Sequence, residues 1–151
     1  MSGVTVTATW LKSNLNMVKV LDASWYLKSM ERSPGVAFNA KEEFSARRIQ
    51  GALYFDIDDV SDKENPMPHM LPTARVFAEK VAKLGISKAS HVVVYDGKGI
   101  FSSPRAWMMF KIFGHDRVSI LDGGFPAWYL LHHPAPRIEA DASNSTCVAS
   151  S

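Results

Sequence analysis

The feature that most constrains this chain is the stretch from His91 to Arg105, where three consecutive valines precede a glycine-containing loop and a Ser-Pro pair. A short apolar run of this kind is typical of a buried strand. Ser103 as N-cap and Pro104 as first helical residue then predict a helix, because proline at that position gives up no hydrogen bond. In open α/β sheets ligands bind beyond the carboxyl ends of the strands, and a helix N-terminus presents N–H groups to anions. The stretch therefore predicts an active-site loop, with Asp96 as its first residue.

Other short apolar runs predict three further strands, at residues 17–22, 52–55 and 118–121. Helices are predicted between and after them, at residues 24–30, 39–48, 73–84, 103–113 and from 124 onward. Asn39 is expected to cap the second of these helices and Gly51 to end it, while Asp122 is expected to cap the last one. Residues 5–15 fit either a short helix or an irregular cover.

This alternation of strands and helices predicts the α/β class, with a mostly parallel central sheet and helices on both of its faces. One domain is expected to span residues 5–133. Residues 134–151 are small and polar and show no periodicity, so a linker or flexible tail is expected there. Cys147 is the single cysteine and lies in this tail, so an internal disulfide is excluded and a catalytic role is disfavoured.

Charge and hydropathy give no reason to expect a nucleic-acid or membrane partner. The formal net charge is only +2 over 151 residues. No apolar run approaches the roughly 18 residues that a membrane-spanning helix needs. Residues 1–20 resemble neither a secretory signal nor an Arg-rich transit peptide. We therefore expect a cytoplasmic protein, with a mitochondrial location as the alternative.

Residues 56–69 are strongly acidic and lack both helical and strand periodicity, which predicts a long ordered loop. Its acids and histidine could be considered as ligands of Mg²⁺ or Ca²⁺ in a hydrolase: Asp56, Asp58, Asp59, Asp62 and His69. This alternative is disfavoured because neither a recognised ligand spacing nor a phosphate-binding loop accompanies them. A phosphatase is disfavoured too, since its chemistry needs a loop cysteine where Asp96 stands.

Seven short segments, taken together and in order, resemble the N-terminal domain of two-domain rhodaneses, the thiosulfate and mercaptopyruvate sulfurtransferases. They are Arg-Ile-Gln-Gly-Ala (48–52), Phe-Asp-Ile-Asp (55–58), His-Met-Leu-Pro (69–72), His-Val-Val-Val-Tyr-Asp (91–96), Pro-Arg-Ala-Trp (104–107), Phe-Gly-His (113–115) and Leu-Asp-Gly-Gly-Phe (121–125). The resemblance runs from about residue 15 to residue 128 and implies the rhodanese fold, which agrees with the pattern of strands and helices.

The resemblance also implies that this domain is catalytically silent. In that family the C-terminal domain carries a loop cysteine that forms a persulfide, whose anion is stabilised by N–H groups at a helix N-terminus. Asp96 stands at the place of that cysteine, so the chain has no nucleophile there. We expect the charge of Asp96 to fill the anion site itself, with Lys98 and Arg105 as candidate partners.

Asp58 and His69 match the positions that the resemblance assigns to a supporting relay with a serine of the catalytic domain. A carboxylate that orients an imidazole can manage a proton while a C–S bond breaks; the competing interpretation is that both side chains only satisfy loop backbone groups. The pair favours mercaptopyruvate over thiosulfate as donor.

The implied partners are a C-terminal rhodanese domain of the same protein and, through it, small sulfur donors and thiol acceptors, with no cofactor and no metal. The alternative is a stand-alone rhodanese-like binding or regulatory module.

Overall fold

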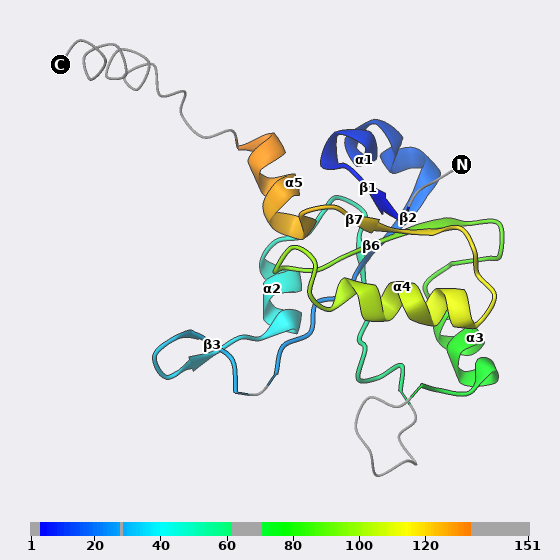
Figure 1. Cartoon of the computed structure of the whole chain (residues 1–151), viewed down its shortest axis with the longest axis horizontal. Coiled ribbons are helices and arrows are strands. Elements are labelled where there is room, and N and C mark those ends of the chain that lie inside the picture. The colour runs from blue at the N-terminus through cyan, green and yellow to red at the C-terminus, as the bar shows by residue number, and fades with distance from the viewer. Residues whose placement is uncertain (1–3, 28, 62–70, 134–151) are drawn as a thin grey trace.

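A five-stranded sheet forms the centre of the computed structural model, which describes residues 4–27, 29–61 and 71–133 (Figure 1). All neighbouring strands are parallel, in the order β1–β7–β6–β2–β5. The strands are β1 (Thr5–Val6), β2 (Val18–Asp22), β5 (Leu53–Tyr54), β6 (His91–Tyr95) and β7 (Val118–Leu121). The predicted parallel sheet is therefore confirmed.

Helices cover both faces of this sheet, as predicted. Figure 1 shows α1 and α5 on one side of the sheet and α3 and α4 on the other. The helices are α1 (Ala8–Asn14), α2 (Ala40–Ala46), α3 (Ala74–Lys83), α4 (Ser103–Ile112) and α5 (Gly124–His132), and a short 3-10 helix, η1 (Leu15–Met17), follows α1. The side chains of Thr7, Asn39 and Thr73 each accept a backbone N–H and so cap α1, α2 and α3.

Strand β6 divides the core into two layers because successive side chains of a strand point to opposite faces. Val92 and Val94 pack with α3 and α4, in a cluster that includes Phe77 and Phe110. Val93 and Tyr95 pack in the other cluster, with Leu11, Ile49, Leu121 and Trp128 of the opposite layer. Full burial of an apolar side chain of this size contributes about 1.5–3 kcal/mol to the stability of the fold. The valine run therefore fixes the position of β6 between the two layers.

The predicted helix at 24–30 is wrong, because the described residues of this segment form no helix. Consecutive residues of the segment instead bind separate parts of the fold: Trp25 N–H donates to Ser102 at 3.0 Å, the Trp25 indole to Asp58, and the Tyr26 hydroxyl to Glu43 at 2.6 Å. Tertiary contacts thus override the local helical pattern. An antiparallel hairpin follows that the sequence analysis did not predict, β3 (Glu31–Ser33) and β4 (Val36–Ala37), turning at Pro34 and Gly35.

Three predicted helix ends differ from the structure. Helix α2 ends at Ala46 because Arg47 is extended, and the chain then buries Ile49 completely in the core; Gly51 therefore does not end α2. The N-cap of α4 is Ser102 rather than Ser103. The N-cap of α5 is Gly123, in the left-handed conformation, so Asp122 does not cap that helix.

The structure confirms a helix within the undecided segment 5–15, preceded by β1. In the described part of the chain, no helix has the length and apolar character needed to cross a membrane. The predicted tail at residues 134–151 lies outside the described residues.

The histidine that opens β6 gives the fold a predictable response to acid. His91 Nε2 lies 3.0 Å from Ser119 Oγ, and its ring packs 5.6 Å from that of Trp10. Burial lowers the pKa of His91 from 6.5, and Arg117 and His115 lower it further. The unfolded chain therefore takes up this proton more readily than the folded one, and the free energy of unfolding should fall as the pH drops below 6.5.

We expect His91→Gln to flatten the pH dependence of urea unfolding between neutral pH and mild acid, because glutamine keeps a hydrogen-bonding group but does not titrate. His133→Gln, at an exposed position, serves as the control and should leave the slope unchanged. An unaltered slope in His91→Gln would contradict the assignment.

Candidate functional site

The candidate site lies at the carboxyl ends of β2 and β6, the two central strands of the sheet. From β2 the chain continues to β5 on one side, and the later strands β6 and β7 lie on the other, so the strand order reverses between β2 and β6. Ligand crevices of open α/β sheets form at such a switch point. The backbone joins the two loops there, since Ala23 N–H donates to the Tyr95 carbonyl at 2.8 Å.

The carboxylate of Asp96 occupies the N-terminal end of α4. Oδ2 accepts backbone N–H groups from Phe101 at 2.9 Å, Ser102 at 3.0 Å and Ser103 at 2.8 Å. Oδ1 accepts the N–H of Lys98 at 2.9 Å. The residue is only 1% exposed. As expected from the sequence, a side chain of the protein itself fills the anion site. These four N–H groups are called the Asp96 cradle below.

The candidate partners of Asp96 contribute in a different way from that expected. Lys98 donates its backbone N–H, while its ammonium lies 4.2 Å from the ring centroid of Phe38. Arg105 lines a small cavity of about 250 Å³ together with Trp25, Ile57, Phe101 and Ser102. The negative charge of Asp96 is therefore held by backbone dipoles, and Lys98 adds no side-chain ion pair.

Side-chain hydroxyls connect the cradle to the loop after β2. Ser102 Oγ donates to the Ala23 carbonyl at 2.7 Å and accepts the N–H of Trp25 at 3.0 Å. Ser24 Oγ accepts the N–H of Gly97 at 3.0 Å. Residues more than seventy positions apart in the chain are thus fixed together at the ends of two strands.

Helix α5 closes the cradle from a third side. Phe125 N–H donates to the Asp96 carbonyl at 3.0 Å. Gly124 has a φ of 57°, and a Cβ there would lie 2.5 Å from the Asp96 carbonyl oxygen and 2.6 Å from that of Gly99. Glycine is therefore required for α5 to approach the loop this closely.

Tyr26 covers the outer side of the loop. A Cβ on Gly97 would come within 2.6 Å of the Tyr26 hydroxyl, so the backbone of Gly97 packs directly against it. The hydroxyl donates to Glu43 Oε1 at 2.6 Å, and Arg32 holds Glu43 Oε2 at 3.0 Å. Burial and the Glu43 hydrogen bond raise the pKa of Tyr26, so it remains a neutral donor at physiological pH.

Asp22, the last residue of β2, lines a cavity of about 600 Å³ on the side of the loop where Tyr26 lies. Burial raises the pKa of its carboxyl, although Oδ1 accepts the N–H of Ser24 at 2.9 Å. Neither Asp22 nor Tyr26 was among the site residues predicted from the sequence. Nothing local marks Tyr26, whereas the position of Asp22 at a strand end was an available signal, because such a residue faces the ligand crevice.

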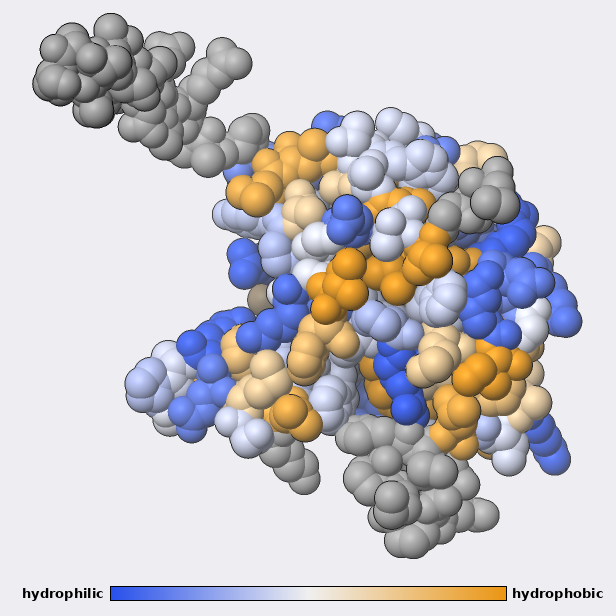
Figure 2. Space-filling view, viewed as in Figure 1, coloured by the Kyte–Doolittle hydropathy of each residue, from blue (hydrophilic) through white to orange (hydrophobic). Residues whose placement is uncertain are grey.

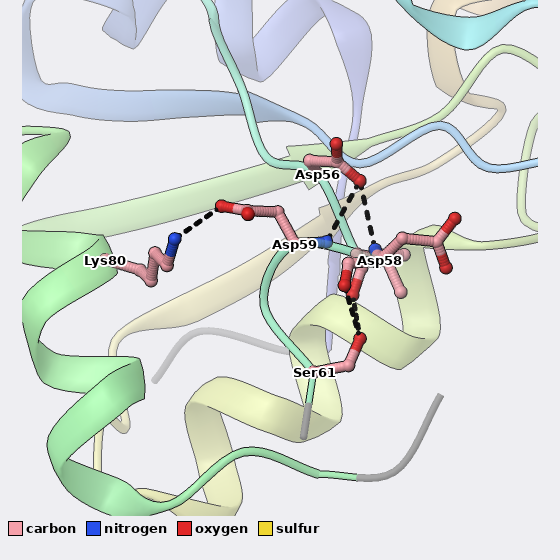
Figure 3. Close-up of polar contacts among 6 residues, drawn as sticks. Asp56, Asp58, Asp59, Ser61 and Lys80 are labelled. Carbon is pink, nitrogen blue, oxygen red and sulfur yellow. Dashed lines mark hydrogen bonds and ion pairs between the residues drawn. The ribbon is translucent and has the colours of Figure 1, made fainter. Parts of the chain in front are cut away.

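The acidic segment after β5 begins as a compact turn. Asp56 Oδ1 accepts the N–H groups of Asp58 at 3.0 Å and Asp59 at 3.3 Å, and Ser61 Oγ donates to the Ile57 carbonyl at 2.6 Å. The side chains of Asp58 and Asp59 point to opposite sides of this turn (Figure 3). Asp59 binds Lys80 of α3 at 2.7 Å, which anchors the turn to the body of the domain.

Asp58 carries its carboxylate toward the loop after β2. Both of its oxygens accept the indole N–H of Trp25, at 3.2 and 3.1 Å. The structure therefore places this predicted site residue beside Trp25, which the sequence analysis missed. His69 lies outside the described residues, as does Asp62, so the predicted pairing of Asp58 with His69 stays a prediction.

No group of three or more His, Cys, Asp or Glu side chains suited to a metal ion occurs among the residues that the structure describes. Asp56 accepts a backbone N–H of the turn, and Asp59 binds Lys80. The metal alternative also included Asp62 and His69, which are outside that part of the chain.

Helix α4 presents an apolar face to solvent next to the cradle. Ala106, Met109 and Phe110 are buried, whereas Met108 is 46% and Ile112 is 52% exposed. Phe101, in the loop, is 43% exposed. Figure 2 shows apolar residues gathered in a band over the side of the molecule that α4 covers. Within the described residues nothing covers this face.

Comparisons with known proteins agree with this geometry. The family described as "Rhodanese-like domain" matches residues 7–131. The chain is 47% identical over 125 residues to "Thiosulfate/3-mercaptopyruvate sulfurtransferase 1, mitochondrial" of Arabidopsis thaliana, covering 82% of this chain and 31% of that protein. It is 47% identical over 131 residues to 3-mercaptopyruvate sulfurtransferase of Rattus norvegicus, covering 82% of this chain and 42% of that one.

Among solved structures, similarity extends to a protein from Escherichia coli described under the "Rhodanese" fold and catalytic mechanism of 3-mercaptopyruvate sulfotransferases. The TM-score is 0.73 at 36% identity, over 85% of this chain and 48% of that one. The chain thus spans less than half the length of each of these three proteins.

The hydrogen bonds of the cradle predict that replacing Asp96 lowers the stability of the folded domain. Asp96→Ala leaves four N–H groups without their acceptor, and we expect it to lower the free energy of unfolding by about 2–4 kcal/mol. Urea denaturation followed by circular dichroism measures this. Asp122→Ala is the matched control, because Asp122 also follows a strand but is exposed, and its change should stay within about 0.5 kcal/mol. Equal effects of the two substitutions would contradict the role of Asp96.

Proposed function

Because this chain belongs to the family of rhodanese-like domains, we propose that it is the N-terminal, catalytically silent domain of a sulfurtransferase. In this proposal it gives structural and interface support to a persulfide-forming cysteine in a C-terminal rhodanese domain. The donor is 3-mercaptopyruvate in preference to thiosulfate.

The single observation that carries the proposal is the occupied Asp96 cradle. Sulfur transfer through a persulfide needs a thiolate that attacks the donor and then holds the sulfur as an anion. Converging N–H groups stabilise such an anion and lower the pKa of a thiol. Here all four N–H groups are bound to a carboxylate, which cannot form a persulfide. The loop keeps the architecture of a nucleophile loop without the nucleophile.

The exposed face of α4 supports a second domain as partner. Phe101, in the loop after β6, and Met108 and Ile112, on α4, are exposed apolar side chains, and of the three Phe101 lies at the candidate site, where its N–H donates to Asp96. Apolar patches of this kind mark interaction surfaces in soluble proteins. The related proteins are more than twice as long as the aligned chain, which leaves room for one more domain of similar size. A C-terminal rhodanese domain docked there would bring its loop close to the candidate site.

Asp58 is the residue through which this domain would act on the reaction. Trp25 holds both of its carboxylate oxygens, which fixes the direction of the charge. In the proposed relay Asp58 orients His69, and the imidazole transfers a proton as the C–S bond of mercaptopyruvate breaks. Thiosulfate cleavage breaks an S–S bond and has no comparable demand, which is why the pair favours mercaptopyruvate.

The alternative is a stand-alone rhodanese-like module that binds or regulates without catalysis. An occupied cradle and an exposed apolar face are compatible with both proposals. An antibody raised against this domain distinguishes them in an extract of the source cells, because the first proposal requires a band of about twice the mass of this chain.

The same extract, fractionated, tests the proposed cytoplasmic location against a mitochondrial one, which the name of the Arabidopsis relative suggests.

The proposal predicts that the isolated 151-residue chain does not turn over sulfur donors. Assays with thiosulfate and cyanide, and with mercaptopyruvate and a thiol, should give the rate of the buffer alone. The Cys147→Ser variant controls for chemistry of the tail thiol. Turnover that persists in Cys147→Ser would refute the proposal.

A second prediction tests the cradle directly. In a Cys147→Ser background, Asp96→Cys should produce a thiol with a pKa at least about one unit below the usual value near 8.5, because the N–H groups favour the thiolate. Ultraviolet absorbance of the thiolate during a pH titration measures it. The matched variant Asp122→Cys, exposed after β7, should titrate normally, and a common pKa for both variants would count against an anion-stabilising loop.

A further inference from the structure

The cavity of about 600 Å³ that Asp22 lines has no role in the proposed function. It lies where the ends of β2 and β6 meet the hairpin β3–β4, helix α2 and the start of α5. Cavities that hold small molecules have volumes of roughly 300–1,000 Å³, and in open α/β sheets they form at the switch point of the strand order. The position and size of this cavity are therefore those of a ligand site.

The inner wall of the cavity holds a buried carboxyl group without a counter-charge. Asp22 is 4% exposed and has only neutral hydrogen-bond partners, the Ser24 backbone N–H at 2.9 Å and the hydroxyls of Ser24 and Tyr95. Within the described residues no lysine or arginine forms an ion pair with it. Aspartate is rarely buried without a partner charge, so a cationic group that enters the cavity gains a favourable contact there.

A positive group lines the same cavity closer to solvent. Arg47, the first residue after α2, is exposed, and its guanidinium lies 5.6 Å and 5.4 Å from the ring centroids of Phe125 and Tyr129. Within the described residues its side chain forms neither a hydrogen bond nor an ion pair. Contact with aromatic rings orients a guanidinium without using up its N–H donors, which match the geometry of a carboxylate.

The other charged side chains of the lining do not neutralise these two groups. Arg32 binds Glu43 at 3.0 Å, and the Tyr26 hydroxyl donates to the same carboxylate at 2.6 Å. Glu42 is exposed in the first turn of α2, where the helix dipole favours a negative charge. The cavity therefore presents a negative group on its inner wall and a positive group near its opening.

We propose that this cavity binds a small zwitterion of the amino acid type, with its ammonium group at Asp22 and its carboxylate at Arg47. A simple amine would leave the Arg47 donors without an acceptor, and a simple carboxylic acid would bring its negative charge toward Asp22. The apolar part of such a ligand would lie against the rings of Tyr95 and Phe125, which line the cavity. The proposal is independent of the proposed function, because it uses neither the Asp96 cradle nor a second domain.

The test is a nuclear magnetic resonance titration of the 151-residue chain that follows backbone amide signals. The Gly97 amide reports on the cavity, which Gly97 lines, and the Gly114 amide, beyond the far end of α4, reports on a remote site. The probes are four amino acids of increasing charge separation: glycine, β-alanine, γ-aminobutyrate and ε-aminocaproate. For each of them, an alkylamine and a carboxylic acid of the same chain length carry only one of the two charges.

We expect at least one amino acid of the series to shift the Gly97 signal in a saturable way while the Gly114 signal stays in place. The tightest binder reports the separation of the two charged contacts. Its single-charge analogues should bind at least about tenfold more weakly, because each lacks one charge-assisted hydrogen bond. Equal binding of the amino acid and either analogue overturns the proposal, as does the absence of a saturable shift with all four amino acids.

A pair of aspartate variants assigns the ammonium end. Asp22→Asn removes the charge but keeps an oxygen that can accept the Ser24 N–H, and we expect it to weaken binding of the amino acid at least about tenfold. Asp122→Asn, at an exposed position after β7, is the matched control and should leave the affinity unchanged. Unchanged affinity in a folded Asp22→Asn variant would overturn the proposal.

A pair of arginine variants assigns the carboxylate end and does not depend on a buried position. Arg47→Gln should weaken binding of the amino acid and of its carboxylic acid analogue but not of its amine. Arg48→Gln is the control, because Arg48 is also exposed and lies over a ring, that of Phe44 at 4.6 Å, but does not line the cavity. Equal effects of the two arginine substitutions would show a general charge effect and overturn the assigned site.

Discussion

Four backbone N–H groups and one carboxylate hold together the centre of this domain. Asp96 follows the central strand β6, and its oxygens satisfy N–H groups of the loop and of the first turn of α4. Without an acceptor the N–H groups of Ser102 and Ser103 would be buried and unpaired, at a cost of about 1–3 kcal/mol each. The other contacts of the site depend on this arrangement. Ser102 is placed by the same turn that donates to Asp96, and its hydroxyl then fixes the loop after β2. Phe125 and Gly124 bring α5 against the carbonyl of Asp96.

Those parts of the fold that depend on local pattern were predictable from the sequence. The run of valines predicted β6, because a short apolar run of this kind is typical of a strand buried on both faces, and the helix predicted at 73–84 is α3. Helix 24–30 was predicted wrongly because tertiary contacts override the local pattern there, among them the bond from Trp25 N–H to Ser102, which lies seventy-seven residues away. No local propensity contains that information. The early end of α2 has a similar cause, since Arg47 becomes extended so that Ile49 can enter the core.

Some residues of the candidate site could likewise be predicted from the sequence, and others could not. The position of Asp96 could be predicted, because a residue directly after a buried strand and before a Ser-Pro helix start faces the ligand crevice. That its charge fills the helix N-terminus followed from electrostatics. Trp25 and Tyr26 could not be found, because their importance comes from contacts across the sheet: one with Asp58 after β5, the other with Glu43 on α2. The partners that hold a site in place come from elements that meet only in the folded chain.

Under the proposed function, these contacts explain how a loop of this shape persists without a cysteine at its first position. A loop built from converging N–H groups needs an anion to be stable, whether that anion is a thiolate, a persulfide or a carboxylate. A residue without an acceptor oxygen in the place of Asp96 would leave the cradle unsatisfied, and the loops after β2 and β6 would lose a common support. A carboxylate cannot form a persulfide, so under the proposed function the residue that stands in the place of the nucleophile also keeps the loops after β2 and β6 together.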